Sequence, residues 1–408
     1  MSNTTTPLAD LVDRFDHHDP RLTPDLAEEV HRVLRERSAV AHSTAYGGMW
    51  ILTRFAEVSA AYQDHRTYRS GDGVLFPRAP GTPRFAPLEY DAPHHMLYRR
   101  LMTPAVALPR TKEIRDGVHG LVGARLRHLT RRGGGDWLRD LALPLPLDVL
   151  VLTVGFSTRA RDRLHELTRL TWRHIHRADG TRDFWPQFAT LLDEEIDRAR
   201  RSDAAESYLA WLVRQDFDGR PATGTELHPL LVALAIAGHD TTLGGIGHML
   251  WYLSQHPELQ SALRRDPRIA ATVADESLRL WPPVDHETRT TTRAVTIDGT
   301  RIPPGSRVLL LNGAANRDPR RYPDPDSFRL DRPLGHHLSF GNGVHFCVGS
   351  HLARLEMTEI AGQLADHPPF ALTKAPRRHY ENGRHAGFDQ LTFRFRSPTP
   401  GVRGRRGR

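Results

Sequence analysis

The chain has 408 residues, of which 39% are hydrophobic and 25% are charged. Neither share is typical of a disordered, collagen-like or membrane protein, so the composition predicts an ordinary globular protein. The formal net charge of +8 at pH 7 comes almost entirely from arginine, and part of it lies in a glycine-spaced tail with Arg403, Arg405, Arg406 and Arg408. Such a local excess of charge does not indicate a nucleic-acid partner.

The sequence predicts neither a targeting segment nor a membrane anchor. The first 20 residues are polar, and no later stretch reaches the run of about 20 apolar residues that a membrane helix needs. A single cysteine excludes an intramolecular disulfide and agrees with a reducing compartment. We therefore expect a cytoplasmic protein with no membrane partner.

The predicted elements begin with a helix that Thr23 caps and Pro24 starts. A strand is expected at 48–53. Apolar periodicity predicts further helices at 98–102, 118–129, 164–172, 188–196, 208–213, 230–253 and 269–280. Short β-like runs follow at 294–297, 308–311 and 391–395. The expected fold class is mainly α with small β-sheets, in a single domain over residues 1–408 with flexible tails at about 1–20 and 398–408.

Two stretches have no regular pattern, Gly71–Pro87 and Arg177–Asp183. The first is rich in glycine, proline and isolated aromatic residues, and the second is short and polar. Long ordered loops in compact proteins often serve as lids or binding loops, and an ordinary surface connection is the alternative for each.

The strongest local signal is the segment Phe340–Gly349, which runs directly into a helical pattern. Gly341, Gly343 and Gly349 allow tight turns that bring amide N–H groups close to the sulfur of Cys347. The positive end of a helix that begins just after the cysteine would stabilise a thiolate further. Phe340 would pack beside the sulfur and limit the access of water.

Two alternatives remain for a lone cysteine. It could be buried and inert, as most such cysteines are, but the glycines around Cys347 argue against that interpretation. A zinc site is disfavoured, because the chain has no second cysteine and neither a Cys-x-x-Cys nor a His-Glu-x-x-His pattern.

Residues 340–349 read F-x-x-G-x-H-x-C-x-G, and this motif resembles the haem-binding loop of the cytochromes P450 at every defining position. The resemblance implies the fold of that family and a haem b cofactor. It also implies that Cys347 is the iron ligand and that Phe340, Gly341 and Gly349 contribute to the cofactor-binding loop.

The resemblance extends to other segments. Glu276 and Arg279 are three residues apart on a predicted helix, where an ion pair can form, although most such pairs are solvated surface contacts. Followed by the Trp281-Pro-Pro-Val segment, they are similar to the structural core of the family. The resemblance implies a folding role, in which they clamp a later segment that contains Arg329 or Arg332.

Four cations resemble the residues that hold the haem propionates in this family. His95 and Arg99 are four residues apart and therefore share a helical face, and Arg289 and His345 are assigned by their offsets from the two main motifs. For any one of them a surface cation is the alternative. Four cations at matching positions favour propionate binding.

The helix expected at 230–253 carries Ala237-Gly-His-Asp-Thr-Thr at mid-length. Threonine can bond back to a carbonyl one turn earlier, which opens a local groove, while a cap between two separate helices is the alternative. The string resembles the central helix of the family. The resemblance implies that Ala237 and Gly238 leave room for dioxygen, that Thr241 supports the activated oxygen and that Asp240 relays protons. No role is assigned to His239.

The resemblance implies a monooxygenase that uses O₂ to hydroxylate or epoxidise a small organic substrate, such as an intermediate of secondary metabolism. Electrons would come from NAD(P)H through a ferredoxin reductase and a ferredoxin, which would dock near Arg99 and Arg100. One alternative is a haem enzyme of the same fold that catalyses oxidative coupling, desaturation or peroxide-driven oxidation. Another is a haem carrier or gas sensor without turnover. The substrate pocket is expected to be lined from 71–87, 167–185, 234–241, 284–288 and 387–391.

Overall fold

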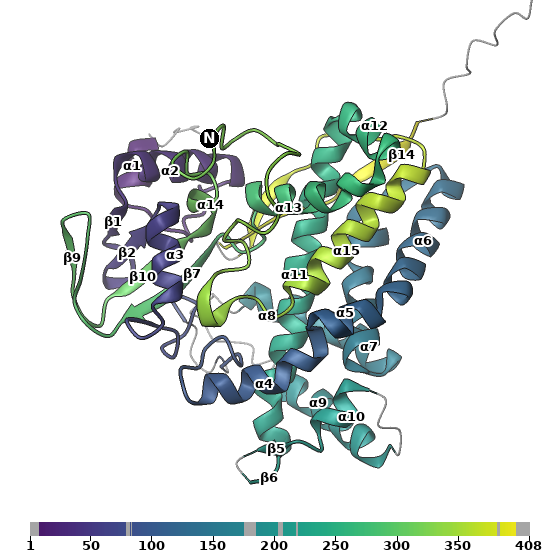
Figure 1. Cartoon of the computed structure of the whole chain (residues 1–408), viewed down its shortest axis with the longest axis horizontal. Coiled ribbons are helices and arrows are strands. Elements are labelled where there is room, and N and C mark those ends of the chain that lie inside the picture. Colours follow the sequence, from purple (N-terminus) through teal and green to yellow (C-terminus); the bar gives the residue numbers. More distant parts are fainter. Residues whose placement is uncertain are drawn as a thin grey trace, which may run out of the picture.

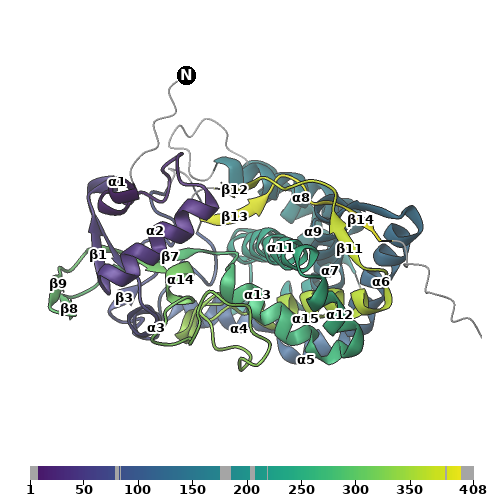
Figure 2. The ribbon, with the colours of Figure 1, turned by 90° about the horizontal axis from the view of Figure 1, so that it is seen from above.

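The structure is a computed structural model that describes residues 8–78, 82, 84–174, 185–202, 207–217, 219–381 and 384–396. The described part consists mainly of helices with small sheets, which confirms the expected fold class. One long helix, α11, runs through the middle of the molecule and has helices on both sides (Figures 1 and 2).

The helices are α1 (Leu8–Asp13), α2 (Pro24–Arg37), α3 (Phe55–Gln63), α4 (His94–Val106), α5 (Leu108–Glu113), α6 (Arg115–Arg132), α7 (Pro144–Val154), α8 (Thr158–His174), α9 (Trp185–Arg201), α10 (Tyr208–Leu212), α11 (Gly224–Gln255), α12 (Pro257–Arg265), α13 (Ala270–Leu280), α14 (Asn312–Ala315) and α15 (Ser350–Gln363). The strands are β1 (Val40–Ser43), β2 (Met49–Leu52), β3 (Tyr68–Arg69), β4 (Gly134–Asp136), β5 (Asp216–Phe217), β6 (Arg220–Pro221), β7 (His286–Thr291), β8 (Val295–Ile297), β9 (Thr300–Ile302), β10 (Arg307–Leu311), β11 (Phe370–Leu372), β12 (Arg378–Glu381), β13 (His385–Phe388) and β14 (Thr392–Phe395).

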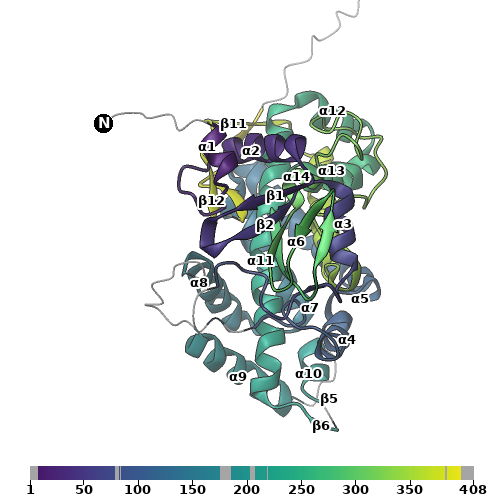
Figure 3. The ribbon, with the colours of Figure 1, turned by 90° about the vertical axis from the view of Figure 1, so that its left-hand side faces the viewer.

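The largest sheet has five strands in the order β1-β2-β10-β7-β3, and its edge with α1, α2 and α3 faces the viewer in Figure 3. Strand β10 pairs parallel to β2 and antiparallel to β7. Because successive side chains of a strand point to opposite faces, Leu309 joins the apolar cluster of α1 and α2. Leu310 joins the cluster under α3 instead. The sheet is thus buried on both faces and fixes α3 in place.

Helix α11 is a single element of 32 residues. A capping box starts it, in which the Thr223 hydroxyl accepts from the amide of Glu226 and the Glu226 carboxylate accepts from the amide of Thr223. By length and composition it could cross a bilayer, but 67% of its most apolar window is buried inside the protein. It packs here as the core helix on which one wall of the main cavity is built.

One expectation about the chain ends and loops needs correction, and two others fall on residues that the structure does not describe. Part of the expected N-terminal tail is ordered, because α1 (Leu8–Asp13) packs its apolar side onto α2 and Phe15 is buried beside it. The expected tail at 398–408 and the irregular stretch Arg177–Asp183 lie outside the described residues.

Glu276 and Arg279 of α13 form a buried ion pair, with each side chain 3% exposed. The guanidinium of Arg279 also donates to the main-chain carbonyls of residues 316, 325 and 327. Glu276 accepts from the side chain of Arg332 at 3.0 Å and from the main-chain N–H of Arg329. The clamp predicted from the sequence is therefore present, and Arg332 supplies its third side chain.

Replacing Glu276 with alanine should lower the free energy of unfolding by about 3–5 kcal/mol, because the buried guanidinium of Arg279 loses its counter-charge. Urea denaturation followed by circular dichroism measures the loss. Arg268→Ala is the matched control, since it removes an exposed arginine from an exposed pair with Asp266 and should leave the midpoint unchanged. Equal midpoints for the Glu276 variant and the unmodified chain would contradict the role of the clamp.

Candidate active site

The segment Phe340–Gly349 forms a loop whose backbone is held on two sides. Gly341 and Gly343 have φ angles of +67° and +69°, a region that favours glycine. A Cβ at Gly343 would collide with the main-chain carbonyl of Tyr62, so the loop packs directly against the end of α3. The amide of Cys347 donates to the carbonyl of Phe340 at 2.9 Å and closes the loop.

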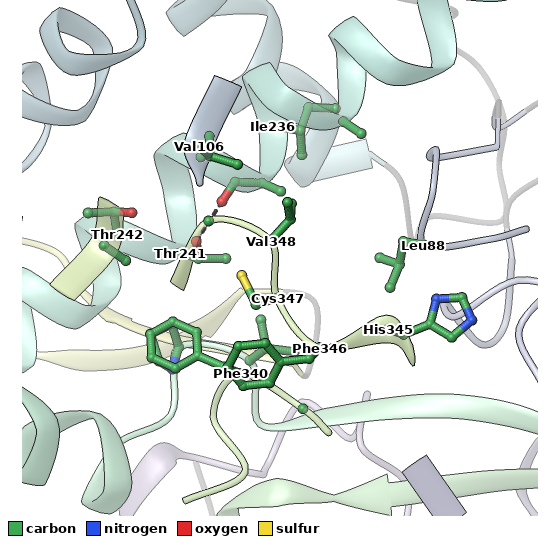
Figure 4. Close-up of a pocket in the computed structure, with 18 of the residues that line it drawn as sticks. Leu88, Val106, Ile236, Thr241, Thr242, Phe340, His345, Phe346, Cys347 and Val348 are labelled. Carbon is green, nitrogen blue, oxygen red and sulfur yellow. Dashed lines mark hydrogen bonds between the residues drawn. The ribbon is translucent and has the colours of Figure 1, made fainter. Parts of the chain in front are cut away.

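The side chain of Cys347 points from this loop into a cavity inside the protein (Figure 4). Burial raises the pKa of the Cys347 thiol, whereas the amide of Gly349 and the guanidinium groups of Arg99 and Arg354 act in the opposite direction. Helix α15 (Ser350–Gln363) begins three residues later, as predicted, and directs its positive end toward the loop. Metal binding to the sulfur would favour the thiolate in this environment.

Among the described residues, no group of three or more histidine, cysteine or acidic side chains could hold a free metal ion. Cys347 would therefore be a single protein ligand. A single thiol at an apolar cavity fits a metal that is carried by an organic group with its own donor atoms.

The opposite wall of the cavity is α11. Ala237, Gly238 and Thr241 line it, and the labelled Thr241 lies across the cavity from Cys347 in Figure 4. The hydroxyl of Thr241 donates to the carbonyl of Ala237 at 2.6 Å, the contact to one turn earlier that the sequence predicts. Since α11 continues through this point, the alternative of a cap between two helices is wrong.

Asp240 lies on another side of α11 and is not part of the cavity wall. One of its carboxylate oxygens is 2.9 Å from Nδ1 of His239, which is buried. The structure thus brings Cys347, Ala237 and Thr241 together at one cavity and places Asp240 behind them.

Positive charge gathers at one end of the cavity, around His345. The ring of His95 lies 4.3 Å from the ring of His345. Burial, together with the nearby groups of Arg289, His95, Arg99 and His65, lowers the pKa of His345 to about 2. All four residues predicted to hold the propionates are therefore neighbours in space.

This cationic cluster, defined as His95, Arg99, Arg289 and His345, takes its charge from the two arginines, because burial lowers the pKa of both histidines, and that charge has little to neutralise it. Within the described residues, Nε2 of His95 and Nδ1 of His345 are buried without a hydrogen-bond partner. The carboxylate of Glu287 comes no closer to Arg289 than 3.9 Å. Unpaired buried donors are costly, so the cluster fits a ligand that brings carboxylates of its own.

The rest of the lining is mostly apolar. The predicted segments 71–87, 234–241 and 284–288 all contribute, through residues such as Val74, Leu234 and Val284. The segment 387–391 does not, and Arg384 and His385, which come shortly before it in the chain, line the cavity instead. Of the segment 167–185, residues 167, 168, 170 and 185 do not line it, and 175–184 lie outside the described part.

Sequence reasoning missed several lining residues and one neighbouring cation. Leu88, Met102 and Leu150 come from separate helices and loops and carry no motif. Glu356 lies nine residues after Cys347 on α15, and its complete burial raises the pKa of its carboxyl well above the usual value. His65 follows α3 and reaches the cationic cluster only through the packing of that helix on the loop. Helical spacing from Cys347 could have indicated Glu356, but nothing local indicates His65.

Comparisons with known proteins agree with this geometry. The family model for cytochrome P450 matches residues 163–365. Cytochrome P450 CYP199A2 of Rhodopseudomonas palustris is 30% identical over 368 residues, which cover 89% of each chain. The cytochrome P450 monooxygenase PikC of Streptomyces venezuelae is 34% identical over 76% of each chain. The crystal structure of CalO2 superposes with a TM-score of 0.81 at 26% identity, and the match covers 94% of this chain and 99% of that one. The chain belongs to the cytochrome P450 family and is an oxidoreductase of the P450 type.

Proposed function

We propose that this enzyme is a haem-thiolate monooxygenase that transfers one oxygen atom of O₂ to a medium-sized, mainly apolar organic molecule by hydroxylation or epoxidation. The observation that carries the proposal is the position of the Cys347 thiol across the cavity from Thr241, with the cationic cluster at one end. This arrangement offers one metal ligand, one hydroxyl donor and a site for two carboxylates around an apolar space.

The cofactor proposed for this cavity is haem b. Cys347 would ligate its iron, and His95, Arg99, Arg289 and His345 would bind its propionates, which supply the missing partners of the two buried ring nitrogens. Phe340, Gly341 and Gly349 would shape the loop beneath it. When bound, haem supplies a redox-active iron at which O₂ is reduced and activated for transfer.

The residues of α11 would then control protons and space. Ala237 and Gly238 have small or no side chains and leave room at the cavity wall. The hydroxyl of Thr241 would turn from the carbonyl of Ala237 to donate a hydrogen bond into the cavity. Asp240, behind the wall, would resupply protons to that side of the helix. The apolar lining would hold the substrate and keep bulk water out.

Electrons would reach the site from NAD(P)H through a ferredoxin reductase and a ferredoxin. The proposed docking face lies beside α4, where Arg100, Met96 and Val344 are exposed next to the cysteine loop. A positive rim around exposed apolar side chains suits an acidic electron carrier. The chain has a single cysteine and so cannot form an intramolecular disulfide, which agrees with a place in the reducing cytoplasm.

The substrate class follows from the lining and from the relatives. The cavity wall is mainly aliphatic and aromatic, with Glu287 and Arg384 as a neutralised polar pair at its edge. Relatives include a 6-deoxyerythronolide B hydroxylase of Saccharopolyspora erythraea at 30% identity and a cyclomarin C epoxidase of Salinispora arenicola at 27%. We propose a secondary metabolite with a large apolar framework as the substrate.

Cys347→Ser should abolish the red-shifted absorption band of the reduced carbon monoxide complex, because an alcohol replaces the thiolate ligand. The absorption spectrum of the dithionite-reduced protein under carbon monoxide measures this. A red-shifted band retained by the variant would show that the sulfur is not the ligand.

His95→Ala should weaken haem binding by about 1–3 kcal/mol, because one carboxylate loses a hydrogen-bond partner. The rate of haem transfer to excess apomyoglobin measures the change. His94→Ala is the control, since His94 precedes His95 on α4 but is exposed. Equal transfer rates for the two variants would contradict the binding role of His95.

Thr241→Ala should bind haem and O₂ normally but release hydrogen peroxide, because the hydroxyl that directs the proton is missing. Asp240→Asn should instead slow reductant consumption as a whole. The measurement compares reductant consumed, peroxide released and product formed. The substrate is the compound that gives the largest shift of the haem absorption in a screen of small organic molecules. Undiminished rate and coupling in both variants would favour chemistry that does not depend on α11, such as peroxide-driven oxidation.

A further inference from the structure

His239 occupies a buried position between Asp240 and the neighbouring helices. Its side chain is 1% exposed. Nε2 lies 3.2 Å from the main-chain carbonyl of Leu143, at the start of α7, and the ring of His165 on α8 packs edge-on at 4.9 Å. The ring thus has a fixed orientation and turns its other nitrogen, Nδ1, toward Asp240.

The two contacts of the ring define where its protons can be. A carbonyl oxygen only accepts, so Nε2 must carry a hydrogen to bond with Leu143. A neutral imidazole has one N–H, and its Nδ1 would then present a lone pair to the carboxylate of Asp240 at 2.9 Å. Two acceptors at that distance repel each other. One additional proton turns the contact into an attraction.

The contact between His239 and Asp240 is close but is not a hydrogen bond as it stands. Among the described residues, Nδ1 of His239 is buried without a hydrogen-bond partner, although Oδ1 of Asp240 lies 2.9 Å away. A proton between Nδ1 and Oδ1 would satisfy both atoms, which would otherwise face each other as two acceptors.

We propose that His239 is a positioning residue that holds Asp240 and shares a proton with it, an inference that rests on the proposed function. In one relay step the proton on Nδ1 moves to Oδ1 of Asp240, which leaves a neutral imidazole and a carboxylic acid. The acid then releases that proton toward the Thr241 side, and a proton from solvent restores His239. The pair returns to its starting charge, and no electron is transferred.

The shared proton can be observed without turnover. In holoenzyme labelled with ¹⁵N-histidine and held as the reduced carbon monoxide complex, the signals of His239 are identified by their loss in His239→Gln. We expect both ring nitrogens to be protonated in the unmodified enzyme and only Nε2 to be protonated in Asp240→Asn. A bare Nδ1 in the unmodified enzyme, or identical His239 signals in both proteins, would overturn the inference.

The kinetic consequence is measured as O₂ consumption with NADPH, spinach ferredoxin reductase and spinach ferredoxin. His239→Gln should lower the rate at least about tenfold and raise the ratio of rates in H₂O and D₂O, since proton delivery becomes limiting. His248→Gln is the matched control, because His248 is buried on the same helix but bonds to the carbonyl of Gly244 and has no acidic partner in the described structure.

These outcomes separate the inference from the function on which it rests. Unchanged rate and isotope ratio in His239→Gln, with slow turnover in Asp240→Asn, would refute the role of His239 and leave the monooxygenase in place. A complete lack of O₂ consumption by the unmodified enzyme would count against the proposed function, while the nitrogen signals would still decide whether the proton is shared. An equal loss in His248→Gln would show a packing effect and overturn the positioning role.

Discussion

A sulfur atom at a fixed place in an apolar cavity is the constraint on which the rest of the structure depends. The thiol of Cys347 stands in surroundings that disfavour its charged form. The groups that stabilise the thiolate therefore have to be part of the folded protein itself. The loop does this with the amide of Gly349, the start of α15 and the nearby guanidinium groups of Arg99 and Arg354. Arg354 also lies over the ring of Phe340, 4.4 Å from its centre, and so ties the loop to α15.

The same constraint explains why polar groups are separated within the cavity. Cations collect around His345 at one end, and apolar side chains cover most of the remaining wall. The Thr241 hydroxyl lies in the wall formed by α11, and Asp240 lies behind it, outside the apolar space. A substrate can then bind by its apolar surface without contacting the charged groups.

Much of the candidate site and of the clamp on α13 could be predicted from the sequence, because their residues lie in short local patterns. The turn glycines beside Cys347, the i to i+4 bond of Thr241 and the ion pair of Glu276 with Arg279 all depend on neighbours within a few residues. The predicted strands at 48–53 and 308–311 are also real, but nothing local shows that β2 and β10 pair in parallel.

What could not be predicted depends on contacts between distant segments. His65 approaches the cationic cluster because α3 packs on the cysteine loop. Arg332, and not the side chain of Arg329, contacts Glu276, a choice that the path of the chain between them determines. The motif indicates no role for His239, and its contact with the carbonyl of Leu143, 96 residues earlier, could not be predicted from local sequence.

The clamp formed by Glu276 and Arg279 on α13 affects how freely the side chains of residues 316–332 can be substituted. Arg279 grips residues 316, 325 and 327 through main-chain carbonyls, and Glu276 holds Arg329 through its main-chain N–H. Every residue type offers a carbonyl, and every type except proline offers an N–H. Apart from Arg332, whose side chain also bonds to Glu276, these contacts therefore do not depend on the side chains of the segment that they hold. Exposed positions of this segment, such as Arg320 and Asp324, can therefore change their side chains without loosening its attachment to α13.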